Sequence, residues 1–474
     1  MNTSTTQIEN FKNFESELSL IERLSTLDQF AIQLLGHEDI QTRISKRGKD
    51  LDIEIATRLN DLNPDTELCF AIDKIDYEIK RLNRYSFNAK IDLNAAYFSS
   101  NYEINILQSK GFKVYGLFKT FYPVDLDEIK SFHTQFETVT HQRENTEYFY
   151  DCLRIDINGI TFDITQVQVQ SKGYYVFECL DSETFENYSE TCFSIRQAMG
   201  FISKLMVGDE EYTFDESGKL YYSNYTRPTI KGMYSPITTN PYSYLDIEKD
   251  IADRFQGCLT RISLENFSNL VSKIHSDSDF STAVLVILEV TSVRSLLLIP
   301  SSFAVIIELL AKAITVDETG LEVPIPDNNL KSTIIRELYE VIDRHSDQLN
   351  EESILKLKRR LNEINKPTNR QHLTNNEKLT RPFEQLGIRL SLHDLKIIEH
   401  RNDLLHGNIL LQTSEEQTID TTNIYMAYVS AKLYTLISKL ILKSIGYSGY
   451  VYNQAKYLEK YMENNTTEEY FERI

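Results

Sequence analysis

The stretch SLHDLKIIEHRNDLLHGN, residues 391–408, predicts one helix whose beginning and end are both marked in the sequence. Ser391 followed by Asp394 resembles a capping box, in which each side chain accepts a hydrogen bond from the backbone N–H of the other residue. Gly407 is suited to end the helix in a left-handed conformation that other residues avoid. His406 would then lie in the last turn, where the negative end of the helix dipole favours the protonated imidazole.

Three polar residues of this stretch are spaced to share one face of the helix. Glu399, Asn402 and His406 follow an i, i+3, i+7 pattern, which places them within an arc of about 60°. Asn402 and His406 are neighbours one turn apart, so a hydrogen bond between them would orient the imidazole.

Arg401 lies about 140° away from this polar face. Its neighbours on that side are the apolar residues Ile397, Ile398 and Leu405. A guanidinium among apolar side chains needs a partner, and a helix–helix interface can supply one. If that interface has two-fold symmetry, two copies of Arg401 and His406 would meet in one cleft.

These residue types suit RNA cleavage without a metal. A scissile phosphate needs a cation to balance the charge that builds on its oxygens, and Arg401 can supply it through two parallel hydrogen bonds. A histidine that titrates near neutral pH can act as the base for the 2′-hydroxyl or as the acid for the 5′-leaving oxygen. Asn402 would position His406 or a phosphate oxygen.

The run RNDLLH, residues 401–406, resembles the RX4–6H motif of HEPN domains, with a polar residue after the arginine as that family prefers. Gly407 and a long helix predicted at 422–445 are similar to the Apea-like bacterial branch of the family. The resemblance covers roughly residues 246–463, and the motif helix is its specific part.

The resemblance implies an all-helical bundle, a homodimer that builds one active site from two motifs, and a metal-independent endoribonuclease. It also implies a role in phage defence, abortive infection or toxin-type growth arrest. We expect a site with these residues: Arg401, Asn402 and His406 as catalytic, and Glu399 and Asp403 as auxiliary. We expect no metal and no cofactor.

Other interpretations stay open. In an ordinary helix Arg401 would form a salt bridge and His406 would cap the C-terminus. Some HEPN domains do not cleave RNA, so the chain could be a non-catalytic binding or dimerisation protein. A third possibility is a protein that binds a ligand, such as a glycan or peptide, through its N-terminal half.

The charge is distributed unevenly along the chain. The formal net charge of −20 argues against a protein that coats DNA or a membrane. Residues 353–402, however, hold 11 Lys and Arg against 5 Asp and Glu, a net of +6, which is typical of a local polyanion site. The candidate RNA-binding residues are Lys356, Arg359, Arg360 and Lys396. A solvated helix face would explain the same charges.

The sequence beyond about Asp246 predicts helices and no sheet. The expected helices are 247–258, 263–275, 279–298, 302–315, 329–346, 351–365, 391–406, 422–445 and 450–463. The stretch 366–380, with Pro367 and several Asn residues, predicts a loop.

The N-terminal half has a different pattern of apolar and charged residues. Residues 7–62 place apolar and charged residues at helical spacing and predict helices. Runs rich in Tyr, Phe, Val and Ile then predict a mostly antiparallel sheet, with strands at 67–72, 112–120, 152–157, 160–168 and 174–180. Asn158-Gly159 predicts a tight hairpin turn. A helix at 189–207 and a second hairpin at 212–225 follow.

These patterns predict an α+β protein of two domains. Residues 226–243, rich in Pro, Thr, Ser and Asn, mark the boundary. Residues 1–245 would form a β-rich regulatory domain, with helices at 7–62, that senses a phage or host trigger. Residues 246–474 would form the all-α HEPN-like domain.

Cysteine usage and hydropathy favour a cytoplasmic protein. The five cysteines, an odd and scattered set without a CxxC pair, indicate reduced thiols. The N-terminus lacks a secretion signal, and no uncharged stretch is long enough to span a membrane. His133, Glu137 and His141 recur every four residues, but a strand at 136–140 would keep the outer two apart, so we expect no metal site there.

Overall fold

The computed structural model describes residues 14–28, 30–34, 40–56, 68–72, 74–92, 95–129, 131–143, 146–149, 151–169, 171–203, 206–224, 253, 261–290, 295–315, 321–322, 325, 327–363, 368–369, 375–400, 419–461 and 467–474. The chain forms two compact units. Residues 1–313 together with 390–474 make the first, and residues 314–389 make the second. The expected boundary segment, residues 226–243, lies outside the described residues, so a domain boundary near residue 245 stays a prediction.

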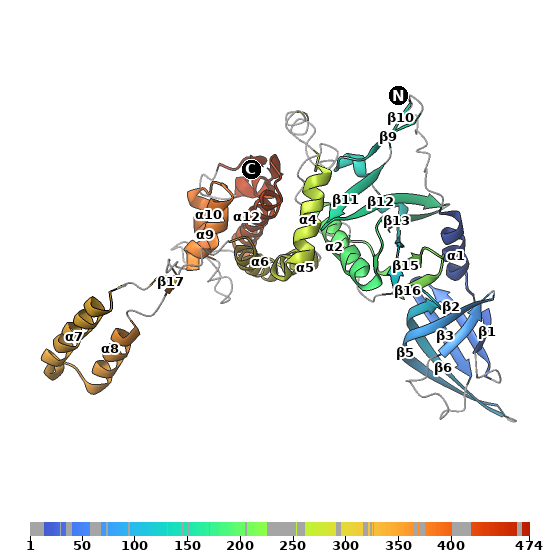
Figure 1. Ribbon diagram of the computed structural model, residues 1–474, viewed down its shortest axis with the longest axis horizontal. Coiled ribbons are helices and arrows are strands. Elements are labelled where there is room, and N and C mark those ends of the chain that lie inside the picture. Colours follow the sequence, from blue (N-terminus) through green and yellow to red (C-terminus); the bar gives the residue numbers. More distant parts are fainter. Residues whose placement is uncertain are drawn as a thin grey trace. The chain divides into compact units, whose positions relative to one another are not determined.

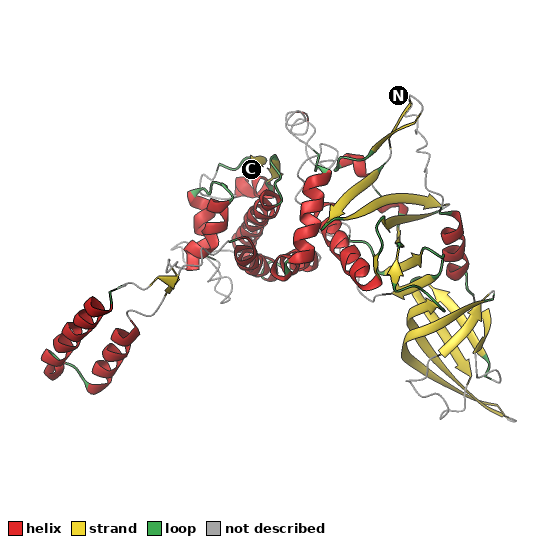
Figure 2. Cartoon of the chain, viewed as in Figure 1, coloured by secondary structure: helices red, strands yellow, loops and turns green. Residues whose placement is uncertain are grey.

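The largest feature of the first unit is an antiparallel sheet that has 12 strands among the described residues. Its order is β11-β12-β13-β8-β15-β16-β6-β3-β2-β1-β4-β5. The strands are β1 Phe30–Leu34, β2 Thr42–Arg47, β3 Asp50–Ala56, β4 Leu68–Ile72, β5 Ile75–Asp92, β6 Ala95–Ser109, β8 Phe118–Val124, β11 Cys152–Ile157, β12 Ile160–Val169, β13 Lys172–Cys179, β15 Glu210–Asp215 and β16 Leu220–Asn224. Figure 2 shows them in yellow.

One end of this sheet closes on itself. Strand β5 pairs with both β4 and β6, so the strands β6, β3, β2, β1, β4 and β5 form a ring. Alternate residues of β3, Leu51, Ile53 and Ile55, are buried, as expected for strands with one face in a core. Helix α1 (Glu15–Ser25) adds Ile21 and Leu24 to the same hydrophobic cluster.

The expectation of helices throughout residues 7–62 is wrong for the described residues 30–34 and 42–56, which contain strands β1 to β3. The segment LDIEIA, residues 51–56, alternates with a period of two, which is a strand pattern. Strands β2 and β3 pair from Arg47↔Asp50 onward, across a turn where Gly48 has φ +62°. Residues 75–92 and 95–109 form the two longest strands, where we predicted none.

The other end of the sheet matches the sequence prediction more closely. Strands β11, β12 and β13 form an antiparallel meander, and Ile157 pairs with Ile160 across Asn158 and Gly159. Both turn residues have positive φ, 55° and 85°, as a two-residue hairpin turn requires. The predicted strands at 67–72, 152–157, 160–168 and 174–180 and the hairpin at 212–225 are confirmed. The strand expected at 112–120 begins later, at β8.

Helices cover this end of the sheet (Figure 1). Helix α2 (Phe185–Ser203) packs through buried Tyr188, whose hydroxyl donates to the carbonyl of Phe177 at 2.9 Å. Helix α4 (Leu264–Ser276) lies against β11, where the Ser268 hydroxyl accepts from the backbone N–H of Asp156. Helix α5 (Ser278–Val290) follows α4 and also contacts α2.

The remaining described residues of the first unit are mostly helical. It contains α6 (Leu298–Ile314), α10 (Leu392–Glu399) and the long α12 (Ile419–Ser444). The helices predicted at 263–275, 302–315 and 422–445 are confirmed, whereas the one at 279–298 is interrupted at residues 295–297, which are not helical. The predicted helix 247–258 and the later part of 391–406 lie outside the described residues, except for Asp253. None of the described helices has the length and apolar composition needed to cross a membrane.

The expectation that the C-terminal half contains no sheet is wrong. Strand β19 (Tyr450–Tyr452) pairs with β20 (Phe471–Arg473), and a 3-10 segment, η5 (Gln454–Tyr461), follows β19. We predicted a helix at 450–463 because its apolar residues recur at helical spacing. The strand partner of residues 450–452 lies about twenty residues further along, beyond the reach of local periodicity.

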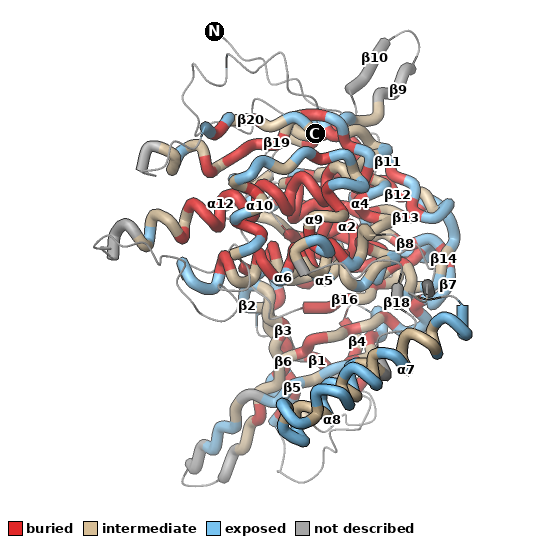
Figure 3. The backbone as a smooth tube through the Cα atoms, turned by 90° about the vertical axis from the view of Figure 1, so that its left-hand side faces the viewer, coloured by how far each residue is buried: buried red, intermediate tan, exposed pale blue. Residues whose placement is uncertain are grey.

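The second unit contains α7 (Asn328–Arg344), α8 (Glu351–Glu363) and α9 (Asn375–Gln385), with short strands β17 (Leu321–Glu322) and β18 (Thr368–Asn369). Helices α7 and α8 contact each other, and the Tyr339 hydroxyl donates to the carbonyl of Lys358. No described residue of these two helices is buried, as their colours in Figure 3 show. Helix α9 overlaps the predicted loop 366–380, which is therefore wrong from Asn375 onward.

Short pieces complete the described structure. Strand β7 (Tyr115–Gly116) pairs with β14 (Glu183–Thr184), and β9 (Thr140–Arg143) pairs with β10 (Thr146–Phe149). The remaining 3-10 turns are η1 (Leu126–Glu128), η2 (Phe132–Thr134) and η4 (Ser346–Gln348). The whole is a mixed α+β structure with a large antiparallel sheet.

Candidate functional site

The residues expected to carry the chemistry follow directly after α10. Four of them lie outside the described residues: Arg401, Asn402, Asp403 and His406. Glu399, the last residue of α10, and Lys396, one turn earlier, are both exposed. The structure therefore describes the helix that leads into the motif, and the site is built from that helix.

The predicted beginning of this helix is confirmed. The Ser391 hydroxyl accepts from the backbone N–H of Asp394 at 3.0 Å, and the Asp394 carboxylate accepts from the backbone N–H of Ser391 at 2.9 Å. This is a capping box with Asp in place of the usual Glu or Gln. Near the opposite end of the helix, Ile397 and Ile398 are buried, each only 1% exposed.

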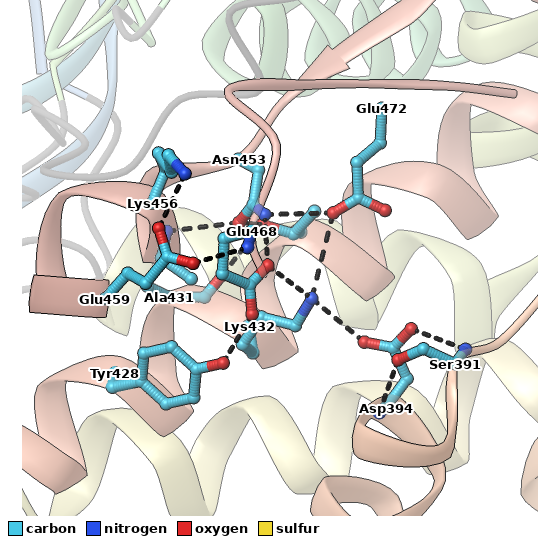
Figure 4. A network of polar contacts seen from close by, with 12 residues as sticks. Ser391, Asp394, Tyr428, Ala431, Lys432, Asn453, Lys456, Glu459, Glu468 and Glu472 are labelled. Atoms are coloured by element: carbon cyan, nitrogen blue, oxygen red, sulfur yellow. Dashed lines mark hydrogen bonds and ion pairs between the residues drawn. The ribbon is translucent and has the colours of Figure 1, made fainter. Parts of the chain in front are cut away.

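The Asp394 carboxylate has a second partner on α12. Its Oδ1 lies 3.0 Å from Nζ of Lys432, and both side chains are buried. The same ammonium lies 3.1 Å from Glu468 Oε2 and 3.7 Å from Glu472 Oε1. Figure 4 shows Lys432 between the carboxylates of Asp394 and Glu468. One buried cation thus joins α10, α12 and the C-terminal segment.

The C-terminal carboxylates are held by further contacts. The Asn453 side-chain amide donates to Glu468 at 2.7 Å and to Glu472 at 3.0 Å. Lys439, one heptad after Lys432 on α12, pairs with Glu472, and the Tyr428 hydroxyl donates to Glu468. We call these seven residues the Lys432 network: Asp394, Tyr428, Lys432, Lys439, Asn453, Glu468 and Glu472.

The pKa values in this network follow from burial and charge. Burial alone would lower the pKa of Lys432, but the carboxylates of Glu472, Asp394 and Glu468 raise it well above its usual value. Burial would raise the pKa of Asp394, yet the ammoniums of Lys432 and Lys439 and the Ser391 N–H hold it below its usual value. Both groups are therefore charged at neutral pH, and the ion pair is fully formed there.

A histidine lies beside the network. Burial, and then the positive charge of Lys432, lower the pKa of His393 below its usual value, so its imidazole is neutral at pH 7. Its ring centroid lies 5.5 Å from that of Tyr428. His393 therefore packs against the network without adding a charge to it.

The Lys432 network was not part of our sequence prediction, although one signal for it exists. Lys432 and Lys439 are seven residues apart, on one face of a helix whose residues 428–442 are all buried. Lysines at such positions need carboxylate partners. The sequence does not identify those partners, because Asp394 and Glu468 are each more than thirty residues away.

The basic candidates of α8 form a separate group. They belong to the second unit, whereas Lys396 belongs to the first. Lys356 pairs with Glu352 at 2.7 Å, but both side chains are more than 70% exposed, so this pair adds little stability. Arg359 and Arg360 are exposed. These side chains are accessible, as contacts to a polyanion would require.

The spaced His133, Glu137 and His141 give no support for a metal site. His133 lies in a 3-10 turn, and its Nδ1 is 2.7 Å from the Ser131 hydroxyl. The side chain of His141 lies outside the described residues. Within the described part of the chain, no three His, Cys, Asp or Glu residues are grouped so that they could hold a metal ion.

Comparison with known proteins finds no relative of this chain. No family model, no curated protein and no solved structure matches the chain. The motif at residues 401–406 and the helix that precedes it are therefore the features of the chain that indicate a function.

Proposed function

We propose that this protein is a metal-independent endoribonuclease that cleaves RNA with Arg401, Asn402 and His406, as HEPN domains do. The observation that carries the proposal is the position of the motif. It follows directly after α10, a helix whose first turn is fixed by a capping box and by the buried Asp394–Lys432 ion pair. A composite site needs its side chains held within a fraction of an ångström, and a helix anchored in this way provides such a support.

The chemistry assigns each residue a step. The 2′-oxygen of one nucleotide attacks the adjacent phosphorus, and a base accepts the hydroxyl proton. Arg401 stabilises the charge on the non-bridging oxygens in the transition state. The 5′-oxygen leaves with a proton from an acid, which gives a 2′,3′-cyclic phosphate and a 5′-hydroxyl. His406 serves as the acid or the base, Asn402 orients it, and Glu399 and Asp403 are auxiliary.

The wider proposal concerns partners and setting. The protein acts as a homodimer in which two motifs form one cleft, and exposed Lys396 and the α8 cations contact RNA phosphates. The β-rich part of the chain responds to a phage or host trigger, and the protein works in the cytoplasm in an anti-phage or abortive-infection role.

The test uses purified full-length protein and a mixed RNA pool in excess EDTA. We expect the wild type to cut and to leave 2′,3′-cyclic phosphate ends, and His406→Asn and Arg401→Ala to be inactive although folded. The matched control is His400→Asn, a neighbouring histidine outside the motif, which should retain activity. If wild type and both motif variants behave alike, the motif is structural, and the non-catalytic binding or dimerisation function becomes the better proposal.

A further inference from the structure

Helices α7 and α8 form a hairpin whose apolar side chains fill no core. None of the described residues of the two helices is buried, as Figure 3 shows by colour. On α7 the residues Leu330, Ile334 and Val341 recur at i, i+4 and i+11, so they lie within an arc of about 40°. Leu330 is 52% exposed and Val341 is 46% exposed. We call these three residues the α7 stripe.

The α7 stripe faces away from α8. The Tyr339 hydroxyl donates to the carbonyl of Lys358, and Oδ1 of Asp343 lies 2.9 Å from Nζ of Lys358. Tyr339 and Asp343 therefore mark the side of α7 that contacts α8. At 100° per residue, the middle of that side lies about 180° from the middle of the stripe. The contact with α8 leaves the stripe open, although an amphipathic helix gains most of its stability by packing its apolar side against another element.

The charge of the hairpin is divided between its two ends. The end at the turn, residues 337–352, holds six Asp and Glu against one Arg, a net of −5. The opposite end, residues 327–336 and 353–363, holds six Lys and Arg against two Asp and Glu, a net of +4. We call these ends the tip and the base. The ion pairs Lys356–Glu352 and Lys358–Asp343 each join a base ammonium to a tip carboxylate, which still leaves a net of −3 at the tip and +2 at the base.

Helix α7 has the same polarity by itself. Residues 327–336 hold two cations against one carboxylate, a net of +1, and residues 337–344 hold three carboxylates against one cation, a net of −2. Lys331 lies about 80° to one side of the stripe and Glu337 about 40° to the other. Neither these two residues nor Glu340 forms an ion pair within the described part of the chain. The stripe is therefore flanked by charges that no described residue balances.

A second copy of the same hairpin matches both features. If two copies dock antiparallel about a two-fold axis, stripe packs on stripe over about 16 Å, and each acidic tip lies beside the basic base of the other copy. A parallel arrangement would bring tip to tip and base to base, where like charges repel. An unrelated partner would need an apolar stripe with the same polarity in reverse, whereas a second copy has both.

We propose that the protein dimerises through its α7 stripes, with the two hairpins antiparallel. This inference assigns a contact surface to the homodimer of the proposed function, and to that extent it rests on that function. In such a dimer α8 lies on the outer side of each α7. The exposed Arg359 and Arg360 therefore remain accessible to RNA.

Sedimentation velocity of the full-length protein at several concentrations tests this surface. We expect the wild type to form a reversible dimer. The double variant Leu330→Asp, Val341→Asp should dimerise at least about a hundredfold more weakly, because the contact would bury four carboxylates. Both positions are about half exposed, so far-UV circular dichroism should show unchanged helix content. The matched control is Val114→Asp, Leu180→Asp, which changes two exposed apolar residues of the first unit and should dimerise as the wild type does.

Two charge variants test the antiparallel orientation. Lys331→Glu, Arg336→Glu changes the base from +4 to 0, and Glu337→Lys, Glu340→Lys changes the tip from −5 to −1. Each variant should dimerise about tenfold more weakly than the wild type, whereas a parallel dimer would be strengthened by either change. In an equimolar mixture one tip–base contact keeps its native charges, so native mass spectrometry should show more heterodimer than either homodimer.

A wild type that stays monomeric would overturn the proposal, because the stripe is then covered within one chain or by another partner. A dimer that persists in Leu330→Asp, Val341→Asp would also overturn it, and would leave the proposed homodimer with a different surface. Equal loss in the control variant, or charge variants that dimerise as tightly as the wild type, would count against it in the same way. RNA cleavage is not a readout here and His406→Asn should still dimerise, so failure of this surface and failure of the nuclease proposal are separate results.

Discussion

The carboxylate of Asp394 and the ammonium of Lys432 lie 3.0 Å apart with side chains only 4% exposed, and they join the helix before the motif to α12. Asp394 therefore does two things at once. One of its oxygens caps α10, and the other faces Lys432. The start of the helix and its attachment to the protein depend on the same side chain.

Asp394→Asn should destabilise the protein. The amide oxygen of Asn can still accept a hydrogen bond from the Ser391 N–H, but a neutral amide cannot balance the charge of Lys432. Loss of one partner of a buried ion pair costs about 3 to 5 kcal/mol, and we expect the lower end because Lys432 keeps Glu468. Urea unfolding, monitored by far-UV circular dichroism, measures this loss of unfolding free energy. Glu399→Gln, on the exposed part of the same helix, should change the free energy of unfolding by less than about 0.5 kcal/mol.

The stabilisation by Asp394 should depend on pH. Its pKa is lowered in the folded protein, so its contribution is present above the unfolded pKa and is lost as pH falls through the folded pKa. Lys432 has a raised pKa and stays charged throughout acidic conditions. The difference in unfolding free energy between wild type and Asp394→Asn should therefore shrink as pH is lowered from about 6 to about 3. A difference that stays constant over this range would contradict the charge argument.

Removal of three cations from α8 should weaken RNA binding. The triple variant Lys356→Ala, Arg359→Ala, Arg360→Ala should bind RNA with a salt dependence that is shallower by about 2 in log–log slope, at about 0.7 per single-strand phosphate contact. The maximal cleavage rate should not change, because these residues lie outside the motif. Fluorescence anisotropy at several salt concentrations measures the slope.

The control for that experiment is a second triple variant, Arg81→Ala, Arg84→Ala, Lys110→Ala, whose residues are exposed on the β-rich part of the first unit. It removes the same number of charges and should leave the slope as it is. Equal effects of the two triple variants would show that α8 is only a solvated surface.

Gly159→Ala should destabilise the β11–β12 hairpin. Gly159 has φ +85°, and a Cβ there would meet no atom within 4 Å, so the cost comes from the backbone conformation alone. That cost is about 1 to 2 kcal/mol for a residue with a side chain. Asn158→Gly, at the other turn position, should be tolerated, and thermal unfolding of the two variants makes the comparison.

The predictions that succeeded depend on residues close together in the sequence. The capping box of Ser391 and Asp394 needs only four residues, and the Asn158-Gly159 turn needs two. Both are local hydrogen-bonding or dihedral requirements. The periodic pattern of residues 422–445 likewise predicted α12, because a long apolar helix carries its own signal.

Several of the predictions that failed depend on partners far along the chain. The ring of strands needs β3 to pair with β6 and β1 to pair with β4, and no local pattern states that. Residues 450–452 form a strand because residues 471–473 pair with them. In the same way Lys432 indicates that carboxylates are near it, but only the fold identifies Asp394 and Glu468 as those carboxylates.

Closure of the strand ring has a consequence for self-association. An open sheet presents two edges of unpaired backbone groups, each able to template a strand of another molecule. In the described sheet β4 pairs with Ile75–Ile79 of β5 and so covers the first part of that strand, and β11 is the outer strand at the other end. There, the backbone N–H of Val139 donates to the carbonyl of Cys152, and the Ser268 hydroxyl accepts from the N–H of Asp156. Closure of the ring and these two contacts thereby reduce the length of unpaired backbone edge that the described sheet offers to a strand of another molecule.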